Sequence, residues 1–229
     1  ALSRARAAAA KARPVEQALI EALSARYALP QPEDRKPLDQ AYADAMRRVW
    51  AAHPKDADVG ALFAEALADV RPWDLWTAEG RPQPGTGELL ATLEAVLALD
   101  PRHPLANHLM IHAVEASPFP EKADRAADTL RDLQPGLGHM VHMPSHIDVR
   151  RGRWQQAIEA NAKAIEADRR YAARAPEPGF YRLYMSHNHH MLAYGAMMTG
   201  QSALALAGMQ HRADQPDRPA PRRRRPVHG

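Results

Sequence analysis

The sequence predicts an all-α protein, built as an array of antiparallel helix hairpins. Ala and Leu, which have the highest helix propensities, supply much of the 45% hydrophobic fraction, whereas aromatic residues make up only 6%. Apolar residues recur at helical spacing along most of the chain, and few segments show the period-two alternation of strands. Short connectors that contain Pro or Gly separate the periodic segments, and their lengths suit antiparallel helix hairpins.

The predicted helices follow one another with few long gaps. Each has an apolar stripe on one face and polar residues on the other, which is typical of helices that pack on their neighbours. We therefore expect their Ala, Leu and Trp side chains to form the core. In chain order the periodic segments cover residues 15–29, 38–52, 59–70, 89–99, 105–116, 123–133 and 154–167.

Two longer insertions, 71–87 and 168–186, interrupt the regular spacing. In the first, Trp73 and Trp76 are predicted to anchor the insertion against the helices. The second carries Tyr171, Tyr181 and Tyr184, for which two interpretations remain open. The tyrosines either pack this insertion against the array or close over a groove and restrict the access of water.

A repeat becomes visible when Pro54 is superposed on Pro101. Residues 51–69 then align with residues 98–116, and Pro135 occupies the same place in a third copy. The interval from Pro101 to Pro135 is 34 residues, which is the period of tetratricopeptide repeats.

The segment "GRWQQAIEANAKAIEAD", residues 152–168, resembles the turn and second helix of a tetratricopeptide repeat (TPR). Gly152 occupies the turn, Trp154 the aromatic position, and Ala157 and Ala164 the small close-packing positions. Ile158 and Ile165 complete the buried stripe, and Ala205 is the small residue of a weaker copy after Gly200.

The resemblance is good over residues 87–211 and looser over 37–71. It implies one domain over 1–211, an α-solenoid in which TPR-like hairpins form a right-handed superhelix and the first helix of each pair lines the concave surface. The runs "NHLMIHAVEAS" and "HMVHMPSHI" are also similar to a His-containing bacterial TPR-like subgroup, from which we take no function.

Histidines recur in register on the predicted first helices. In the repeat after Pro101 and in the repeat after Pro135, two histidines stand seven and eleven residues beyond the proline. These pairs are His108 with His112, and His142 with His146. Side chains three, four and seven residues apart on a helix project close together, so Glu115 joins the first pair and His139 the second.

The last repeat carries a third group. When Gly200 is taken as the equivalent of Gly152, His187 matches His139, His190 matches His142, and Tyr194 matches His146. An internal comparison argues against a packing role for these histidines. In the repeat after Pro54 the positions of His108, His112 and Glu115 are held by Ala61, Glu65 and Ala68, so the fold does not require histidine there.

Neutral imidazole is the commonest side-chain ligand for transition metals, so the leading hypothesis is a transition-metal site (copper, zinc or iron) in the concave groove. We expect no more than four of the candidates to contact one ion. In a catalytic site, metal-bound water or dioxygen would react, with Glu115 as candidate base. The nearby methionines, Met140 and Met143, favour copper(I) weakly, because core packing is the commoner role of Met. The candidate ligands are His108, His112, Glu115, His139, His142, His146 and His190.

Pro144 leaves the geometry of the second group open, because proline is tolerated only in the first turn of a helix. A helix that begins near Pro144 would leave His139 in a loop, whereas one that begins earlier would be kinked there. The remaining histidines form no cluster and are predicted to lie at the surface: His53, His103, His189, His211 and His228.

The competing hypothesis is a protein-interaction scaffold without metal. The same groove would then hold a peptide or a helix, and the histidines would be hydrogen-bonding or pH-sensitive contacts. The residues assigned to partner binding in the groove are Asn107, Tyr184, His187 and Tyr194.

Composition excludes several classes of function. The chain has no Cys, so it has neither disulfides nor thiolate metal sites. Residues 212–229 hold six Arg and two Asp, a net charge of +4. Because the whole chain has a net charge of +3, the remaining residues carry about −1, so we expect no basic folded face for nucleic acid. We expect this Pro- and Arg-rich tail to be disordered.

No apolar run is long enough to span a bilayer. The sequence is compatible with a cytoplasmic or an exported protein, and it lacks nucleotide-binding and hydrolase motifs.

Overall fold

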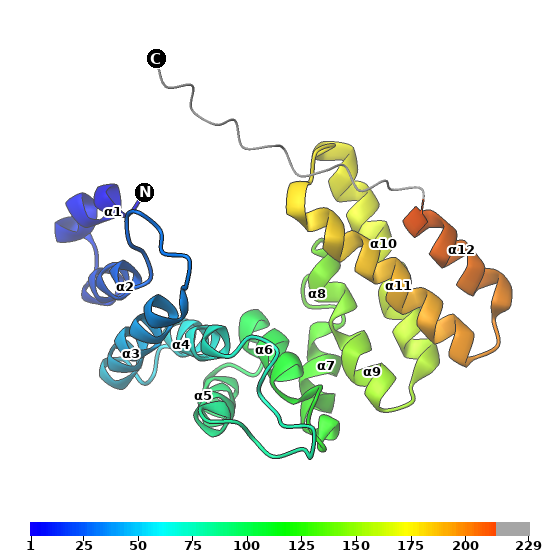
Figure 1. Cartoon of the computed structure of the whole chain (residues 1–229), viewed down its shortest axis with the longest axis horizontal. Coiled ribbons are helices and arrows are strands. Elements are labelled where there is room, and N and C mark those ends of the chain that lie inside the picture. Colours follow the sequence, from blue (N-terminus) through cyan, green and yellow to red (C-terminus); the bar gives the residue numbers. More distant parts are fainter. Residues whose placement is uncertain (214–229) are drawn as a thin grey trace.

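The computed structural model describes residues 1–213, and this part of the chain forms a curved stack of helices (Figure 1). No strand occurs among the described residues; one isolated bridge joins Trp76 to Pro82. The prediction of an all-α solenoid of antiparallel helix hairpins is therefore confirmed. Most of the predicted tail lies outside the described residues, and the last helix runs to Ala213, two residues beyond the predicted domain end.

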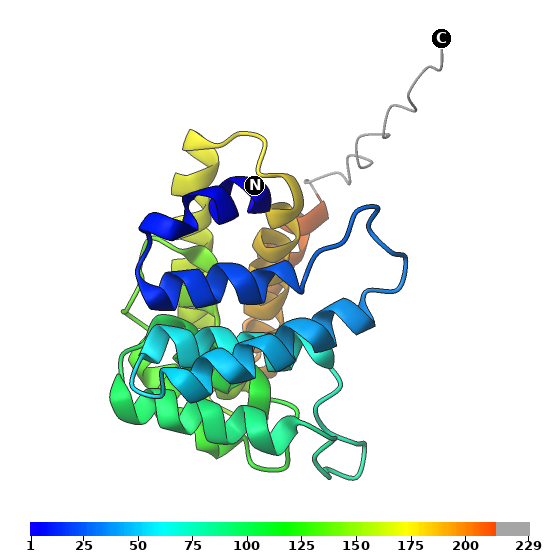
Figure 2. The same ribbon diagram turned by 90° about the vertical axis from the view of Figure 1, so that its left-hand side faces the viewer.

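The amino-terminal part of the arch contains five α-helices and one 3-10 helix. Helices α1, α2 and α3 lie one beneath another when the arch is viewed from this end (Figure 2). The bounds are α1 (Leu2–Ala8), η1 (Ala9–Lys11), α2 (Pro14–Ser24), α3 (Lys36–Ala52), α4 (Ala57–Val70) and α5 (Thr86–Leu99).

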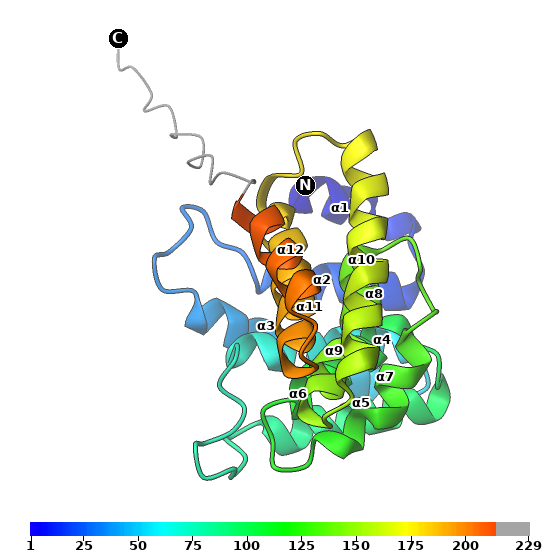
Figure 3. The ribbon, with the colours of Figure 1, turned by 90° about the vertical axis from the view of Figure 1, so that its right-hand side faces the viewer.

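The central and carboxyl-terminal part contains the histidines. Its long helices α10, α11 and α12 run side by side at the other end of the arch (Figure 3). The bounds are α6 (Pro104–Val114), η2 (Pro120–Ala123), α7 (Asp124–Leu130), α8 (Gly138–His142), α9 (Pro144–Arg150), α10 (Trp154–Arg174), η3 (Gly179–Tyr181), α11 (Arg182–Met198) and α12 (Ser202–Ala213).

The hairpins pack through the residues that the repeat pattern marks as small or apolar. Ala157 and Ala164 on α10 are fully buried, and Ile158 contacts Ala196 and Ala205 in the interface with α11 and α12. Gly152 and Gly200, at the turns before α10 and α12, have φ values of 70° and 72°, which glycine adopts without strain. These placements confirm the turn and packing positions of the TPR-like pattern.

A buried carboxylate on α9 forms ion pairs that connect three helices near the histidines. Asp148 of α9 is fully buried, and both of its oxygens accept hydrogen bonds from Arg131, at 2.7 and 2.8 Å. The Arg153 guanidinium, just before α10, lies 2.9 Å from the same carboxylate. The pair therefore links the ends of α7 and α10 to α9, which carries His146.

The two tryptophans of the first insertion differ in role. Trp76 donates a hydrogen bond from Nε1 to the carbonyl of Ala113 at 2.8 Å, so it anchors the insertion to α6 as predicted. Trp73 is 84% exposed, and its ring meets the edge of His112 at a centroid distance of 5.3 Å. Trp73 is therefore too exposed to anchor the insertion as predicted, and its backbone adopts a positive φ of 63°.

Two histidines predicted at the surface are buried. His103 is 6% exposed and caps α6, where its Nδ1 accepts a hydrogen bond from the Ala106 amide. His189 is 8% exposed within α11. The first prediction failed because an N-terminal capping residue can fold back over its own helix, and the second because α12 covers that face of α11.

No helix among the described residues is long and apolar enough to cross a membrane.

Candidate metal centre

Six histidines from three helical segments come together in the middle of the stack. Helix α6 supplies two of them, the α8–α9 segment supplies three, and α11 supplies one. They form two groups, which we call the first trio and the second trio. The first trio is His108, His112 and His139; the second trio is His142, His146 and His187.

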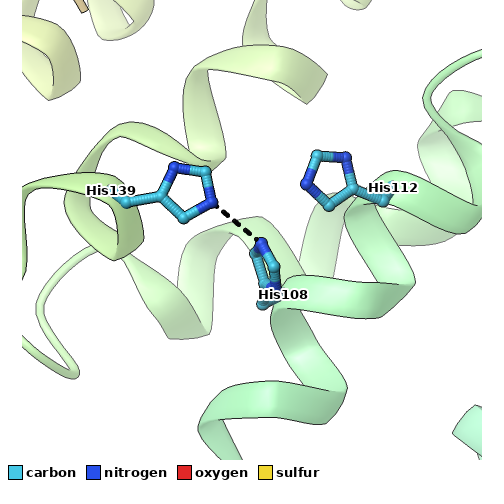
Figure 4. Close-up of side chains that lie close together, drawn as sticks. All are labelled: His108, His112 and His139. Atoms are coloured by element: carbon cyan, nitrogen blue, oxygen red, sulfur yellow. Dashed lines mark hydrogen bonds between the residues drawn. The ribbon is translucent and has the colours of Figure 1, made fainter. Parts of the chain in front are cut away.

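In the first trio, one ring nitrogen from each histidine lies within 4.8 Å of the others. Figure 4 shows the three rings around a common space, with His108 and His112 reaching it from one helix and His139 from another. The Nε2 atoms of His108 and His139 are 3.1 Å apart. The Nδ1 atom of His139 is buried and has no hydrogen-bond partner. The trio thus contains a buried polar atom that the protein itself does not satisfy.

The second trio is more deeply buried. Its ring nitrogens also lie within 4.8 Å of one another, and the Nε2 atoms of His142 and His146 are 2.8 Å apart. The ring of His187 approaches them from α11, at centroid distances of 4.8 Å from His142 and 5.6 Å from His146. Stacking of consecutive repeats therefore brings together nitrogen donors from two helical segments.

The segment around Pro144 resolves the alternative that the sequence left open. Helix α8 begins at Gly138, so His139 is helical, and the helix is interrupted only at Met143. Met143 keeps helical angles (φ −51°, ψ −39°), so α9 continues with Pro144 at its first position, where proline leaves no amide unsatisfied. His139, His142 and His146 consequently stay on one side of the segment.

Gly138 allows this segment to approach α10. A Cβ atom at Gly138 would lie 2.0 Å from Oδ1 of Asp168, so any larger residue would have to displace that buried carboxylate. The same Asp168 oxygen accepts a hydrogen bond from the Tyr181 hydroxyl at 2.9 Å, and that hydroxyl accepts one from the His139 amide at 3.3 Å. The second insertion therefore packs against the solenoid, and its Tyr181 hydroxyl holds the backbone of His139, a member of the first trio.

Glu115 lies between the two trios and joins them. Its Oε1 accepts a hydrogen bond from His112 Nδ1 at 2.7 Å, and its Oε2 accepts a short one from His146 Nδ1. Burial alone would raise the pKa of Glu115, but these two hydrogen bonds bring the pKa below its ordinary value. The sequence suggested a ligand or a base. In the structure both carboxylate oxygens accept hydrogen bonds from imidazoles, so Glu115 orients one histidine of each trio.

The hydrogen bonds of the second trio determine which ring nitrogens are free. Asn161 donates its amide to the Ala157 carbonyl, so its Oδ1, 2.7 Å from His142 Nδ1, can only accept. His142 Nδ1 must therefore carry a proton, and so must His146 Nδ1 beside the Glu115 carboxylate. Neutral rings then place two bare Nε2 lone pairs 2.8 Å apart. These lone pairs repel unless a cation, either a proton or a metal ion, lies between them.

Burial keeps most of these imidazoles neutral. It is the main cause that lowers the pKa of His108 to about 3 and the pKa values of His139 and His187 to about 4. The neighbouring imidazoles lower them further, because each would repel a second positive charge. The pKa of His142 is lowered well below its usual value for the same reasons. Neutral imidazole is the form that binds metal ions.

The metal-free protein is therefore expected to lose stability as the pH falls from about 7 towards 4. In that range the unfolded histidines, with ordinary pKa values near 6.5, bind protons that the folded ones do not, so the free energy of unfolding decreases. Urea unfolding in the presence of a chelator, at pH 7.5 and at pH 5, measures the change. His108→Asn should reduce the slope, and a free energy of unfolding that does not vary with pH would contradict the prediction.

The other predicted site residues lie around the trios or apart from them. His190 is exposed and belongs to neither trio. Its ring centroid lies 6.3 Å from that of His187. Tyr184 packs edge-on against His139, at 4.8 Å. Tyr194 instead packs against Trp154, and Asn107 is buried with its amide on the carbonyls of Pro101 and His103. Met140 and Met143 pack in the core, so the weak argument for copper(I) from soft ligands receives no support.

Asn161 is a residue of the candidate site that the sequence analysis missed. It orients His142, and it stands in the apolar stripe of α10 between Ile158 and Ala164. A polar residue at the spacing of a buried face was the signal that could have found it, because buried amides need partners. Here the partner is a histidine of α8, in the first helical segment of the same hairpin.

A cavity of about 260 Å³ opens beside the first trio. Its walls are mostly apolar, with Trp73 and Trp76 on one side, and both His112 and Glu115 reach its surface. The cavity therefore leads to His112, the member of the first trio that lines it.

Comparisons with known proteins support the fold. No protein-family model matches the sequence, and no curated protein matches it. Three solved structures of MamA, a TPR-like helical repeat protein, are similar to this chain. One is MamA from Desulfovibrio magneticus RS-1, from residue 41 to its end: TM-score 0.58, 13% identity, covering 79% of this chain and 86% of that one. The other two have TM-scores of 0.56 and 0.57 at 14% identity, covering 77% and 78% of this chain and 81% and 89% of theirs. These similarities establish a TPR-like fold.

Proposed function

We propose that this protein binds transition-metal ions through the two histidine trios in the middle of its helical solenoid. The observation that carries the proposal is the second trio, where hydrogen bonds to Asn161 and Glu115 leave two bare Nε2 atoms facing each other at 2.8 Å. Three nitrogen donors within 4.8 Å can bind one ion after small side-chain movements. With metal–nitrogen distances of about 2.0–2.1 Å, a tetrahedral site spaces its nitrogens roughly 3.3 Å apart.

The donors favour zinc, copper or iron, all of which bind imidazole. Three protein ligands leave a coordination position for water or a small molecule, as in zinc enzymes with three histidine ligands. The cavity beside His112 supports access to that position. This arrangement is compatible with metal-dependent chemistry, for which we propose no specific substrate.

Elemental analysis of protein purified without a His-tag tests the proposal. We expect stoichiometric copper, zinc or iron, which is lost in the double variant His112→Ala/His146→Ala. The matched control is His53→Ala/His190→Ala, which removes two histidines outside the trios. Metal-free wild-type protein whose melting temperature does not shift on addition of these ions would refute the proposal.

Glu115→Gln is expected to weaken metal binding at both trios by about 10–100-fold, the usual cost of losing a partner that orients a ligand. A glutamine has one acceptor oxygen, so it can hold His112 or His146 but not both. Competition with a chromophoric chelator measures the affinity. Glu121→Gln, on an exposed carboxylate, should leave it unchanged. An affinity unaffected by Glu115→Gln would show that the carboxylate does not orient the ligands.

The second candidate function is binding of a peptide or protein partner without metal. Exposed aromatic side chains next to the trios favour it, since Trp73 is 84% and Phe180 is 74% exposed and aromatic anchors are enriched at interfaces. Under this alternative, Trp73→Ala would abolish capture of a partner, and chelators would have no effect on that capture. Loss of capture on chelation would instead make the metal part of the binding surface.

A further inference from the structure

We infer that the two trios form one dinuclear centre, in which two metal ions share a small anionic bridging ligand such as hydroxide. This inference rests on the proposed function and makes it more specific. Its alternative is a pair of independent mononuclear sites.

The spacing of the rings supports one centre. Within a trio, ring centroids are 4.8 to 6.5 Å apart. Between the trios, the centroids of His112 and His146 are 5.6 Å apart, and those of His139 and His142 are 5.9 Å apart. The trios are thus as close to each other as the members of each trio are. Ions in protein two-metal centres lie about 3.5–4 Å apart, which this spacing accommodates.

The protein holds the two trios in a fixed relation. His139, His142 and His146 belong to one nearly continuous helical segment and are divided between the trios. Glu115 adds a second connection, because one carboxylate bonds a histidine of each trio. A change in the position of one ion must therefore be transmitted to the ligands of the other.

The charge of the site explains why the bridging ligand would be an anion. Six neutral imidazoles contribute no charge, and Glu115 is the one carboxylate that contacts these histidines in the described part of the chain. Two divalent ions would face a single negative charge in a buried site, which is unfavourable without a further anion. A water bound between the ions would lose a proton to solvent and become the bridging hydroxide, because coordination lowers the pKa of water.

Loading the full chain with copper(II) tests the inference. We expect two ions per chain and an electron paramagnetic resonance signal that accounts for only a small part of the copper, because bridged copper(II) ions couple their spins. Azide, an anion that can replace a bridging hydroxide, should titrate to one equivalent per two ions. His108→Ala and His187→Ala should each bind one ion and give the full signal for that ion, and His190→Ala should behave as wild type.

Two ions per chain with the full signal, or one azide per ion, would overturn the dinuclear centre but leave the proposed metal function intact. A single ion per chain in the wild type would also overturn it. Absence of bound copper would instead refute the proposed function itself. Circular dichroism of each variant confirms that a lost ion does not reflect a lost fold.

Discussion

His142→Ala is expected to abolish metal binding by the second trio, with a loss in affinity greater than about 100-fold. His142 is fully buried, its Nδ1 is committed to Asn161, and its Nε2 is directed at His146. The two histidines that remain in the trio are too few for a stable site. Equilibrium dialysis followed by elemental analysis measures the loss.

His190→Ala is the matched control for this experiment. The sequence predicted His190 as a ligand, whereas the structure places it at the exposed edge next to His187. The variant should therefore keep the wild-type metal content. If His190→Ala lost as much metal as His142→Ala, the assignment of the second trio would be wrong and His190 would have to join it.

Asp148→Ala is expected to lower the free energy of unfolding by about 3–5 kcal/mol, because removing one partner of a buried ion pair leaves buried charge uncompensated. Arg131 and Arg153 both lose this buried partner and keep only Asp128 and Asp124, and α9 loses its connections to the ends of α7 and α10. Urea unfolding followed by circular dichroism measures the change. Because α9 carries His146, we also expect weaker metal binding.

Asp128→Ala is the corresponding control, since Asp128 also pairs with Arg131 but its side chain is 62% exposed. An exposed ion pair contributes at most about 1 kcal/mol. Similar losses in the two variants would indicate that burial of Asp148 does not determine the effect, and that the pair is not what holds α9 in place.

Part of the site could be predicted from the sequence because it depends on helical spacing. The pairing of His108 with His112, and of His142 with His146, follows from the rise of one helical turn. The alignment of the last repeat gave no measure of how far α11 is rotated about its axis, so it could not show that His190 lies outside both trios. Tyr194, which the alignment matched to His146, packs against Trp154 instead of joining the histidines.

The sequence by itself determined the helices, the hairpin connections, the TPR-like repeat and the candidate histidines, because these depend on residues near one another in the chain. Only the tertiary structure decided that the histidines divide into two trios, that Glu115 bonds one member of each, and that Asn161 orients His142. These contacts depend on how the helices pack within and between successive hairpins. The rotation and translation between neighbouring hairpins arise from side-chain packing across the whole interface, which no short-range pattern encodes.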